Sequence, residues 1–126
     1  MTDYECGYYH KFRKELGKLS RKCPTLYEDF ERFKESLLED LEFYKHKLPN
    51  NRYIKLKLKR NRLLPFPAFK VKHFRCKAIN KGANSGFRIV FILDQSNWII
   101  YFVEIYHKNK KIDLNEQQLI DASEDL

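Results

Sequence analysis

Two long apolar runs near the C-terminus constrain the fold of this chain more than any other feature. They cover Phe87–Leu93 and Trp98–Lys108, and both are rich in β-branched and aromatic residues. The residues between them, 94–97, are all turn formers, so the pair predicts an antiparallel β-hairpin. The apolar residues run on without alternating, so we expect both faces of these strands to be covered. The hairpin is therefore predicted to form the centre of a sheet.

Polar residues at one end of this hairpin are the first candidates for a functional site. A charge in such a strand must be paired, hydrated or used. Antiparallel pairing predicts that Arg88, near the start of the first strand, lies beside Tyr106, His107 and Lys108 at the end of the second. The structural alternatives are an ion pair between Arg88 and Glu104 and a plain packing role for Tyr106.

The N-terminal third predicts two amphipathic helices. Apolar residues spaced three and four apart indicate one helix over residues 9–23 and a second over residues 25–45. Thr25 and Glu28 form the sequence pattern of a capping box at the start of the second helix. We expect the two helices to form a hairpin that packs on one face of the sheet, which makes this an α+β fold.

The remaining elements are predicted to be shorter. We expect a strand in residues 2–9, a half-exposed strand or basic loop in residues 53–60, a strand in residues 68–79 and a helix in residues 114–120. Asp113 or Asn115 would cap this last helix, and residues 121–126 are expected to fray.

Positive charge is concentrated in the middle of the chain. The formal net charge is +8, yet residues 43–93 hold fourteen Lys and Arg and no Asp or Glu. The segments before and after, residues 1–42 and 94–126, are both net acidic. This distribution favours a polyanionic partner, most simply a nucleic acid. The alternative is a solvated basic face that serves solubility.

Cysteine usage and hydropathy exclude several classes of protein. Cys6, Cys23 and Cys76 are odd in number and widely spaced, so they predict neither a disulfide framework nor a metal-ligand pattern. No apolar run is long enough for a membrane span, and the N-terminus is too polar for a signal peptide. We therefore expect a cytoplasmic protein that binds no metal and no other cofactor.

Three stretches resemble the RelE/ParE superfamily of toxins from bacterial toxin–antitoxin modules. Residues 12–29 are similar to the family's first helix and its proline-containing joint, residues 85–91 to the opening of its central strand, and residues 105–111 to the basic end of its last strand. The resemblance implies a small twisted antiparallel sheet, a helical hairpin packed on one face and a short C-terminal helix. It also implies one domain over residues 1–126, with a basic insertion at residues 46–67.

Many members of that family are endoribonucleases that cut mRNA on the ribosome, whereas the ParE branch poisons DNA gyrase. The resemblance implies that Arg88 stabilises the scissile phosphate and that Lys77 or His107 transfers protons. The predicted catalytic residues are Arg88, Lys77, His107, Lys108 and Tyr106. The predicted RNA-binding residues are Arg75, Lys72, Lys81, Lys110 and Lys111.

These observations give three hypotheses for the function. The first is a metal-independent mRNA endoribonuclease that acts on the ribosome as the toxin of a type II toxin–antitoxin system. Its partners would be mRNA, the ribosome and a cognate antitoxin with an acidic amphipathic segment, with no membrane and no small-molecule cofactor. The second is a non-enzymatic gyrase poison of the ParE type. The third is a basic nucleic-acid-binding protein without toxicity.

Overall fold

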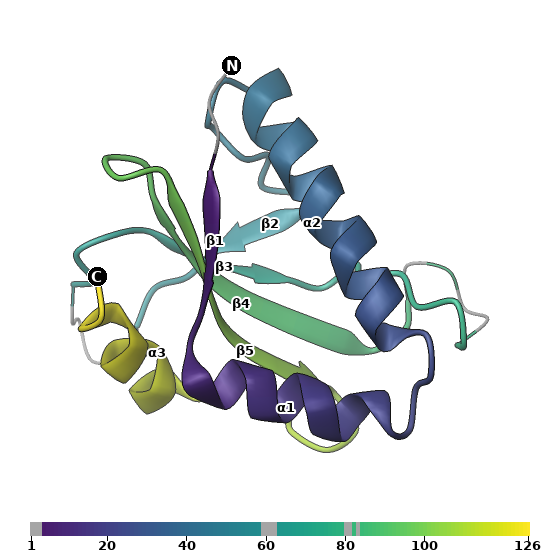
Figure 1. The fold of residues 1–126 in the computed structure, drawn as a ribbon. Helices are drawn as coiled ribbons and strands as arrows, with labels where there is room; N and C mark the ends of the chain where they lie inside the picture. Colours follow the sequence, from purple (N-terminus) through teal and green to yellow (C-terminus); the bar gives the residue numbers. More distant parts are fainter. Residues whose placement is uncertain (1–3, 59–62, 80–81, 83) are drawn as a thin grey trace.

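The computed structural model describes residues 4–58, 63–79, 82 and 84–126. Its elements, in chain order, are β1 (Glu5–Tyr8), α1 (His10–Ser20), α2 (Leu26–Phe43), β2 (Tyr53–Lys55), β3 (Ala68–Val71), β4 (Phe87–Asp94), β5 (Ile99–His107) and α3 (Glu116–Ser123). The strands form one sheet in the order β1-β5-β4-β3-β2. This confirms the predicted α+β fold, with two helices at the N-terminal end and a short one at the C-terminal end (Figure 1).

The hairpin of β4 and β5 lies inside the sheet, as predicted. Arg88 pairs with Tyr106, so the polar ends of the two strands do lie side by side. The register shifts between Val90, which pairs with Glu104, and Phe91, which pairs with Phe102. One residue of β5 is therefore left without a partner strand residue, which defines a β-bulge.

The sheet is mixed, not purely antiparallel as predicted. Strand β1 lies parallel to β5, with Glu5 opposite Ile99 and Tyr8 opposite Phe102. The chain continues directly from β1 into α1, so β1 pairs with the first half of β5 and α1 follows the second half. A parallel neighbour cannot be read from the local sequence, because residues far apart in the chain decide it.

The two faces of the sheet carry separate cores, because side chains alternate along each strand. Helices α1 and α2 cover one face, whose core includes Phe12, Phe30, Phe91 and Phe102. Helix α3 covers the other face, whose core includes Val90, Ile92, Val103, Leu119 and Ala122. Figure 1 shows α2 and α3 on opposite sides of the strands. Covering by helices on both sides explains the continuous apolar runs of β4 and β5.

The strand predicted over residues 68–79 ends early, at Val71, and the predicted capping box is wrong. The chain leaves the sheet and meets the start of α2, where the backbone N–H of Lys77 donates to Asp29 Oδ2 at 3.1 Å and that of Ala78 donates to Thr25 Oγ1 at 3.0 Å. Thr25 makes no side-chain hydrogen bond to the helix backbone. Its hydroxyl instead donates to Asp29 Oδ2 at 2.8 Å, so both side chains serve a distant segment.

The C-terminal end is ordered, contrary to the expected fraying. The side chain of Asn115 caps α3 by accepting from the backbone N–H of Gln118 at 3.1 Å, which confirms one of the two predicted caps. Ala122 is fully buried, and the hydroxyl of Tyr101 donates to Asp125 at 2.6 Å. No helix within the described residues is both long and apolar enough to cross a membrane.

Glu15 of α1 joins both helical layers to the centre of the sheet. Its Oε1 accepts the backbone N–H of Ile105 in β5 at 3.1 Å, and its Oε2 accepts from the side-chain amide of Gln118 in α3 at 3.1 Å. Burial raises the pKa of Glu15, while the two hydrogen bonds act in the opposite direction. The carboxylate thus replaces a strand partner where β5 extends beyond β1.

We expect the substitution Glu15→Ala to destabilise the protein by about 1–3 kcal/mol, because it leaves a buried N–H without its acceptor. Urea unfolding followed by circular dichroism measures this loss. Glu35→Ala is the matched control, since Glu35 is an exposed residue of α2. Equal unfolding free energies for the two variants would contradict the role of Glu15.

Candidate nucleic-acid interface

Arg88 is held at one end of the sheet, on the face that carries α3. It precedes Val90 and Ile92 in the alternation of β4, and both of these pack in the core beneath α3. Its Nη1 donates to the backbone carbonyl of Lys72 at 3.0 Å and to that of Phe87 at 3.3 Å. Carbonyl acceptors orient the guanidinium without cancelling its charge, so Arg88 keeps the ability to bind an anion.

The buried carboxylate of Glu104 pairs with Lys111, which corrects the alternative of an Arg88–Glu104 ion pair. Glu104 is 1% exposed, and the Lys111 ammonium contacts its Oε2. Its Oε1 accepts the backbone N–H of Asn115 at 2.8 Å. A buried carboxylate is stable only when a positive charge or hydrogen-bond donors lie beside it. We therefore infer that Lys111 neutralises Glu104.

Tyr106 lies directly opposite Arg88 and is buried. The ammonium of Lys111 lies 5.5 Å from the centroid of its ring. Burial and, to a smaller extent, the charges of Asp113 and Glu104 raise the pKa of Tyr106 to about 12, against the lowering effect of Arg88. The phenol is therefore protonated at neutral pH, where it can donate a hydrogen bond but cannot accept a proton.

His107 makes two hydrogen bonds to the backbone, one through each ring nitrogen. Its Nδ1 accepts the N–H of Asn109 at 3.2 Å, so the proton of the neutral ring lies on Nε2 and donates to the carbonyl of Ser85 at 3.0 Å. The ring also packs edge-on against Phe87, with centroids 5.0 Å apart. This geometry favours a structural role, in which His107 fixes the loop that leads into β4.

Gly86 brings this loop close to the end of β5. Its φ is +90°, and a Cβ at this position would lie 2.5 Å from Nε2 of His107. The carbonyl of Gly86 accepts the backbone N–H of Lys108 at 2.9 Å, which continues the β4–β5 register by one more pair. The alternation of the strand therefore places Lys108 on the same side as Tyr106 and Arg88.

Arg75 and Lys77 lie beside α2 instead of on a strand next to Arg88. Lys77 is tied through its backbone to Asp29, and Arg75 lines a hollow with Asp29, Arg32 and Phe33 of α2. Both side chains are exposed. The reason is the early end of β3, after which the chain crosses to the helical side.

Three exposed lysines lie in the segments next to Arg88. Lys72 is the residue whose carbonyl orients Arg88, and Lys108 and Lys110 follow directly after β5; all three are exposed. We call Arg88, Tyr106, Lys72, Lys108 and Lys110 the Arg88 cluster. Lys81, also predicted to bind RNA, lies outside the described residues.

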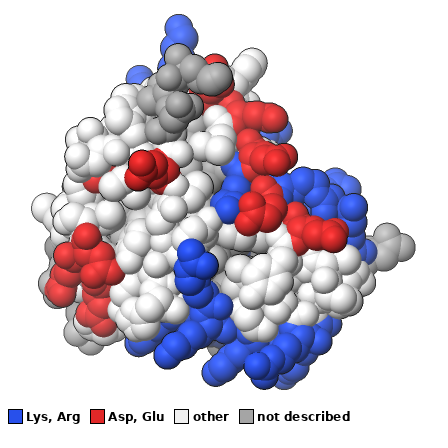
Figure 2. Space-filling view, viewed as in Figure 1, with Lys and Arg blue, Asp and Glu red and all other residues white. Residues whose placement is uncertain are grey.

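Helix α1 carries a second basic surface, which our reading of the sequence missed. Its exposed residues include Lys11, Arg13, Lys14 and Lys18. In Figure 2, Lys and Arg gather along the lower border of the molecule, where Figure 1 places α1, whereas Asp and Glu form patches at the upper right, where Figure 1 places α2, and on the left. The signal was present in the sequence as cations on the outer face of an amphipathic helix, but the acidic residues of α2 masked it in the segment's net charge.

Comparisons with known proteins give one structural similarity. No family model matches this chain, and no curated protein matches it. A solved structure of a mutant of the Escherichia coli toxin RelE in the free state is similar, with 18% sequence identity and a TM-score of 0.47. The match covers 100% of this chain and 99% of that chain.

We expect Gly86→Ala to destabilise the protein by about 1–2 kcal/mol more than Gly82→Ala. Both glycines have positive φ, which costs an L-residue about 1–2 kcal/mol, but a Cβ on Gly82 would meet no atom within 4 Å. At Gly86 the new Cβ would also displace His107 from the carbonyl of Ser85. Thermal unfolding of both variants measures the difference. Equal losses would show that His107 does not hold this loop.

Proposed function

We propose that this chain is a toxin of the RelE kind that cleaves mRNA, and that the Arg88 cluster binds the reacting phosphodiester. The observation that carries the proposal is the placement of Arg88. Its guanidinium is oriented by two backbone carbonyls at the end of the sheet, and one of these carbonyls belongs to the exposed Lys72. The resemblance of residues 85–91 and 105–111 to RelE/ParE toxins supports the same reading.

The chemistry of RNA cleavage by the 2′-hydroxyl explains why an arginine belongs there. The 2′-oxygen attacks the phosphorus, the pentacoordinate phosphate gains negative charge, and the 5′-oxygen leaves with a proton. Arg88 is suited to the charge-stabilising step, because a guanidinium remains charged and grips two phosphate oxygens at once. Tyr106 stays protonated at neutral pH and can add a hydrogen bond from its hydroxyl.

The contacts of each lysine indicate which role it would have in binding RNA. We assign Lys108 to the reacting phosphate with Arg88, since the register places both on one side. Lys72 and Lys110 are exposed and would hold the neighbouring phosphates. We assign Lys111 to Glu104 and His107 to the loop, because their charged or polar atoms are already bonded within the protein.

Arg88→Ala should abolish growth arrest on induction and lower mRNA cleavage by about 10²- to 10³-fold, the usual effect of removing one donor to a developing negative charge. Primer extension on cellular mRNA after brief induction measures cleavage as new 5′ ends. Arg21→Ala is the matched control, because it removes the same charge from an exposed position at the end of α1.

Three outcomes separate the candidate functions. New 5′ ends that vanish in the Arg88 variant support the endoribonuclease. DNA damage with intact messages supports a gyrase poison instead. Binding of RNA without growth arrest supports a nucleic-acid-binding protein without toxicity. Undiminished cleavage by a folded Arg88→Ala protein would contradict the central role of Arg88.

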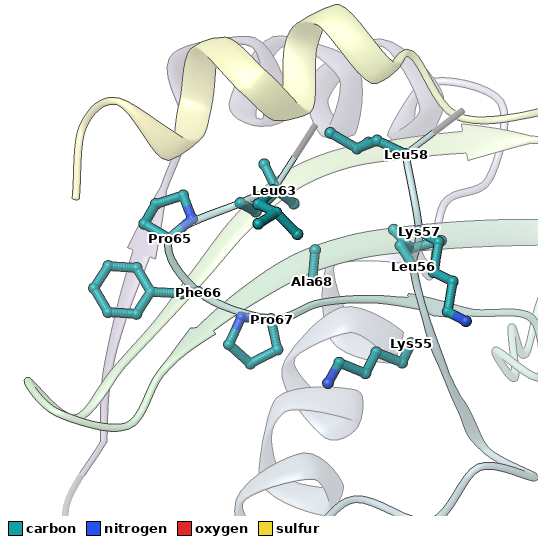
Figure 3. A pocket seen from close by; sticks show the side chains of 10 residues that line it. Lys55, Leu56, Lys57, Leu58, Leu63, Pro65, Phe66, Pro67 and Ala68 are labelled. Atoms are coloured by element: carbon teal, nitrogen blue, oxygen red, sulfur yellow. The ribbon is translucent and has the colours of Figure 1, made fainter. Parts of the chain in front are cut away.

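A basic, apolar groove beside α3 is the surface we propose for the antitoxin. Residues 55–58 and 63–68 line a hollow of about 630 Å³ next to the edge strand β2 (Figure 3). Its apolar side chains include Leu63, which is 93% exposed, and its basic ones are Lys55 and Lys57. An acidic amphipathic segment complements both properties, because its apolar residues would fill the hollow while its carboxylates meet the lysines.

Leu63→Glu should weaken binding of the co-encoded acidic antitoxin by at least about tenfold, since it puts a carboxylate into the groove that the acidic segment must enter. Isothermal titration calorimetry at two salt concentrations measures the loss, and binding to the unmodified protein should weaken as salt rises. Phe43→Glu is the matched control, because Phe43 is a second apolar residue, 77% exposed, at the end of α2. Equal effects of the two substitutions would contradict this docking surface.

A further inference from the structure

The fold brings together two cysteines that are far apart in the sequence. Ligand atoms of Cys23, Asp29 and Cys76 all lie within 4.8 Å of one another. The two cysteines are 3% and 1% exposed, and both are free thiols. Cys23 ends the turn after α1, whereas Cys76 belongs to the segment that leaves the sheet after β3. Their wide sequence spacing gave no sign of this proximity.

The hydroxyl of Thr25 lies among these three side chains. Its position distinguishes between two possible uses of the cysteine pair, a metal site and a disulfide. Thr25 Oγ1 is 4.0 Å from Cys23 Sγ and 3.7 Å from Cys76 Sγ, donates to Asp29 Oδ2 at 2.8 Å, and accepts the backbone N–H of Ala78 at 3.0 Å. A metal ion bound by the two sulfurs and the carboxylate would have to displace this hydroxyl.

The carboxylate of Asp29 is also fully engaged by other donors. Its Oδ1 accepts from Arg32 at 2.7 Å, and its Oδ2 accepts the backbone N–H of Lys77 at 3.1 Å as well as the Thr25 hydroxyl. Metal coordination would break at least one of these bonds. A bond between the two sulfurs leaves all of them in place, so the surroundings favour a disulfide over a metal site.

We propose that Cys23 and Cys76 are a modification site that a peroxide converts into an intramolecular disulfide. One sulfur attacks the O–O bond of hydrogen peroxide, which yields a sulfenic acid and one water. The second sulfur then attacks the sulfenic sulfur and releases a second water. The two thiols lose two electrons and two protons in total, and the peroxide is reduced to two waters.

The disulfide would join the turn between α1 and α2 to the segment that carries Lys72. That segment orients Arg88, so the bond would fix one wall of the Arg88 cluster. Burial raises the pKa of Cys76 to about 11, which keeps this sulfur a thiol at neutral pH. Cys76 should therefore react slowly as the attacking sulfur, because the thiolate is the reactive form.

The test uses the full chain with Cys6→Ser, so that Cys23 and Cys76 are the two remaining thiols. After hydrogen peroxide treatment, we expect the denatured protein to show no free thiol and a mass two hydrogens lower. A proteolytic digest should contain one pair of linked peptides, one with Cys23 and one with Cys76. Dithiothreitol should restore both thiols, and the oxidised protein should melt on the order of 5 °C higher.

Cys23→Ser and Cys76→Ser, each combined with Cys6→Ser, are the matched controls and should give no linked pair within one chain. Three results would overturn the proposal. The thiols could stay unreacted at peroxide concentrations that oxidise Cys6 in the unmodified protein, or they could form sulfinic acids without any link. The third is one equivalent of zinc, added alone, that binds the reduced protein, protects both thiols and is lost in either serine variant; this result would identify a metal site instead.

Discussion

The pairing of β4 with β5 determines where nearly every other part of the molecule lies. Each strand contributes one set of side chains to the core beneath α1 and α2 and the alternate set to the core beneath α3. The same register puts Arg88 opposite Tyr106 and, through the bond from Lys108 to Gly86, extends to the end of the sheet. The stability of the hairpin and the geometry of the Arg88 cluster therefore have one physical origin.

Three carboxylates, two of them buried and one half-buried, determine which donors are held within the protein. Asp29 binds Arg32 and the segment after β3, Glu15 binds the unpaired edge of β5, and Glu104 binds Lys111. Burying a carboxylate is costly unless donors surround it, so each one fixes its neighbours firmly. The consequence for function is that the charge of Lys111 is neutralised by Glu104. Arg88 contacts only backbone carbonyls among the partners described above, so its positive charge can still attract an anionic ligand.

Local sequence patterns predicted the hairpin, the two N-terminal helices and the Asn115 cap, because periodicity and turn residues act over short distances. These patterns failed where contacts between residues far apart in the sequence determine the structure. The path of residues 72–79 depends on bonds from Lys77 and Ala78 to side chains about fifty positions earlier, and the pairing of β1 depends on β5. For the same reason, the roles of Lys111 and His107 and the meeting of Cys23 with Cys76 were not visible. Composition shows how many charged residues the chain has, but it does not show which of them form an ion pair with a buried carboxylate.

The bulge in β5 accommodates one extra residue without exchanging the two faces of the strand. Val103 has no partner in β4, and both Val103 and Glu104 face α3. Because these two residues face the same side, deleting one of them would leave regular alternation, with Tyr106 and Lys108 still on the side of α3. Deleting Ile105 instead would reverse the orientation of the residues after it, which would turn Tyr106 and Lys108 toward the aromatic interior. We expect homologous chains to differ in length at this bulge more readily than at any other position of the strand.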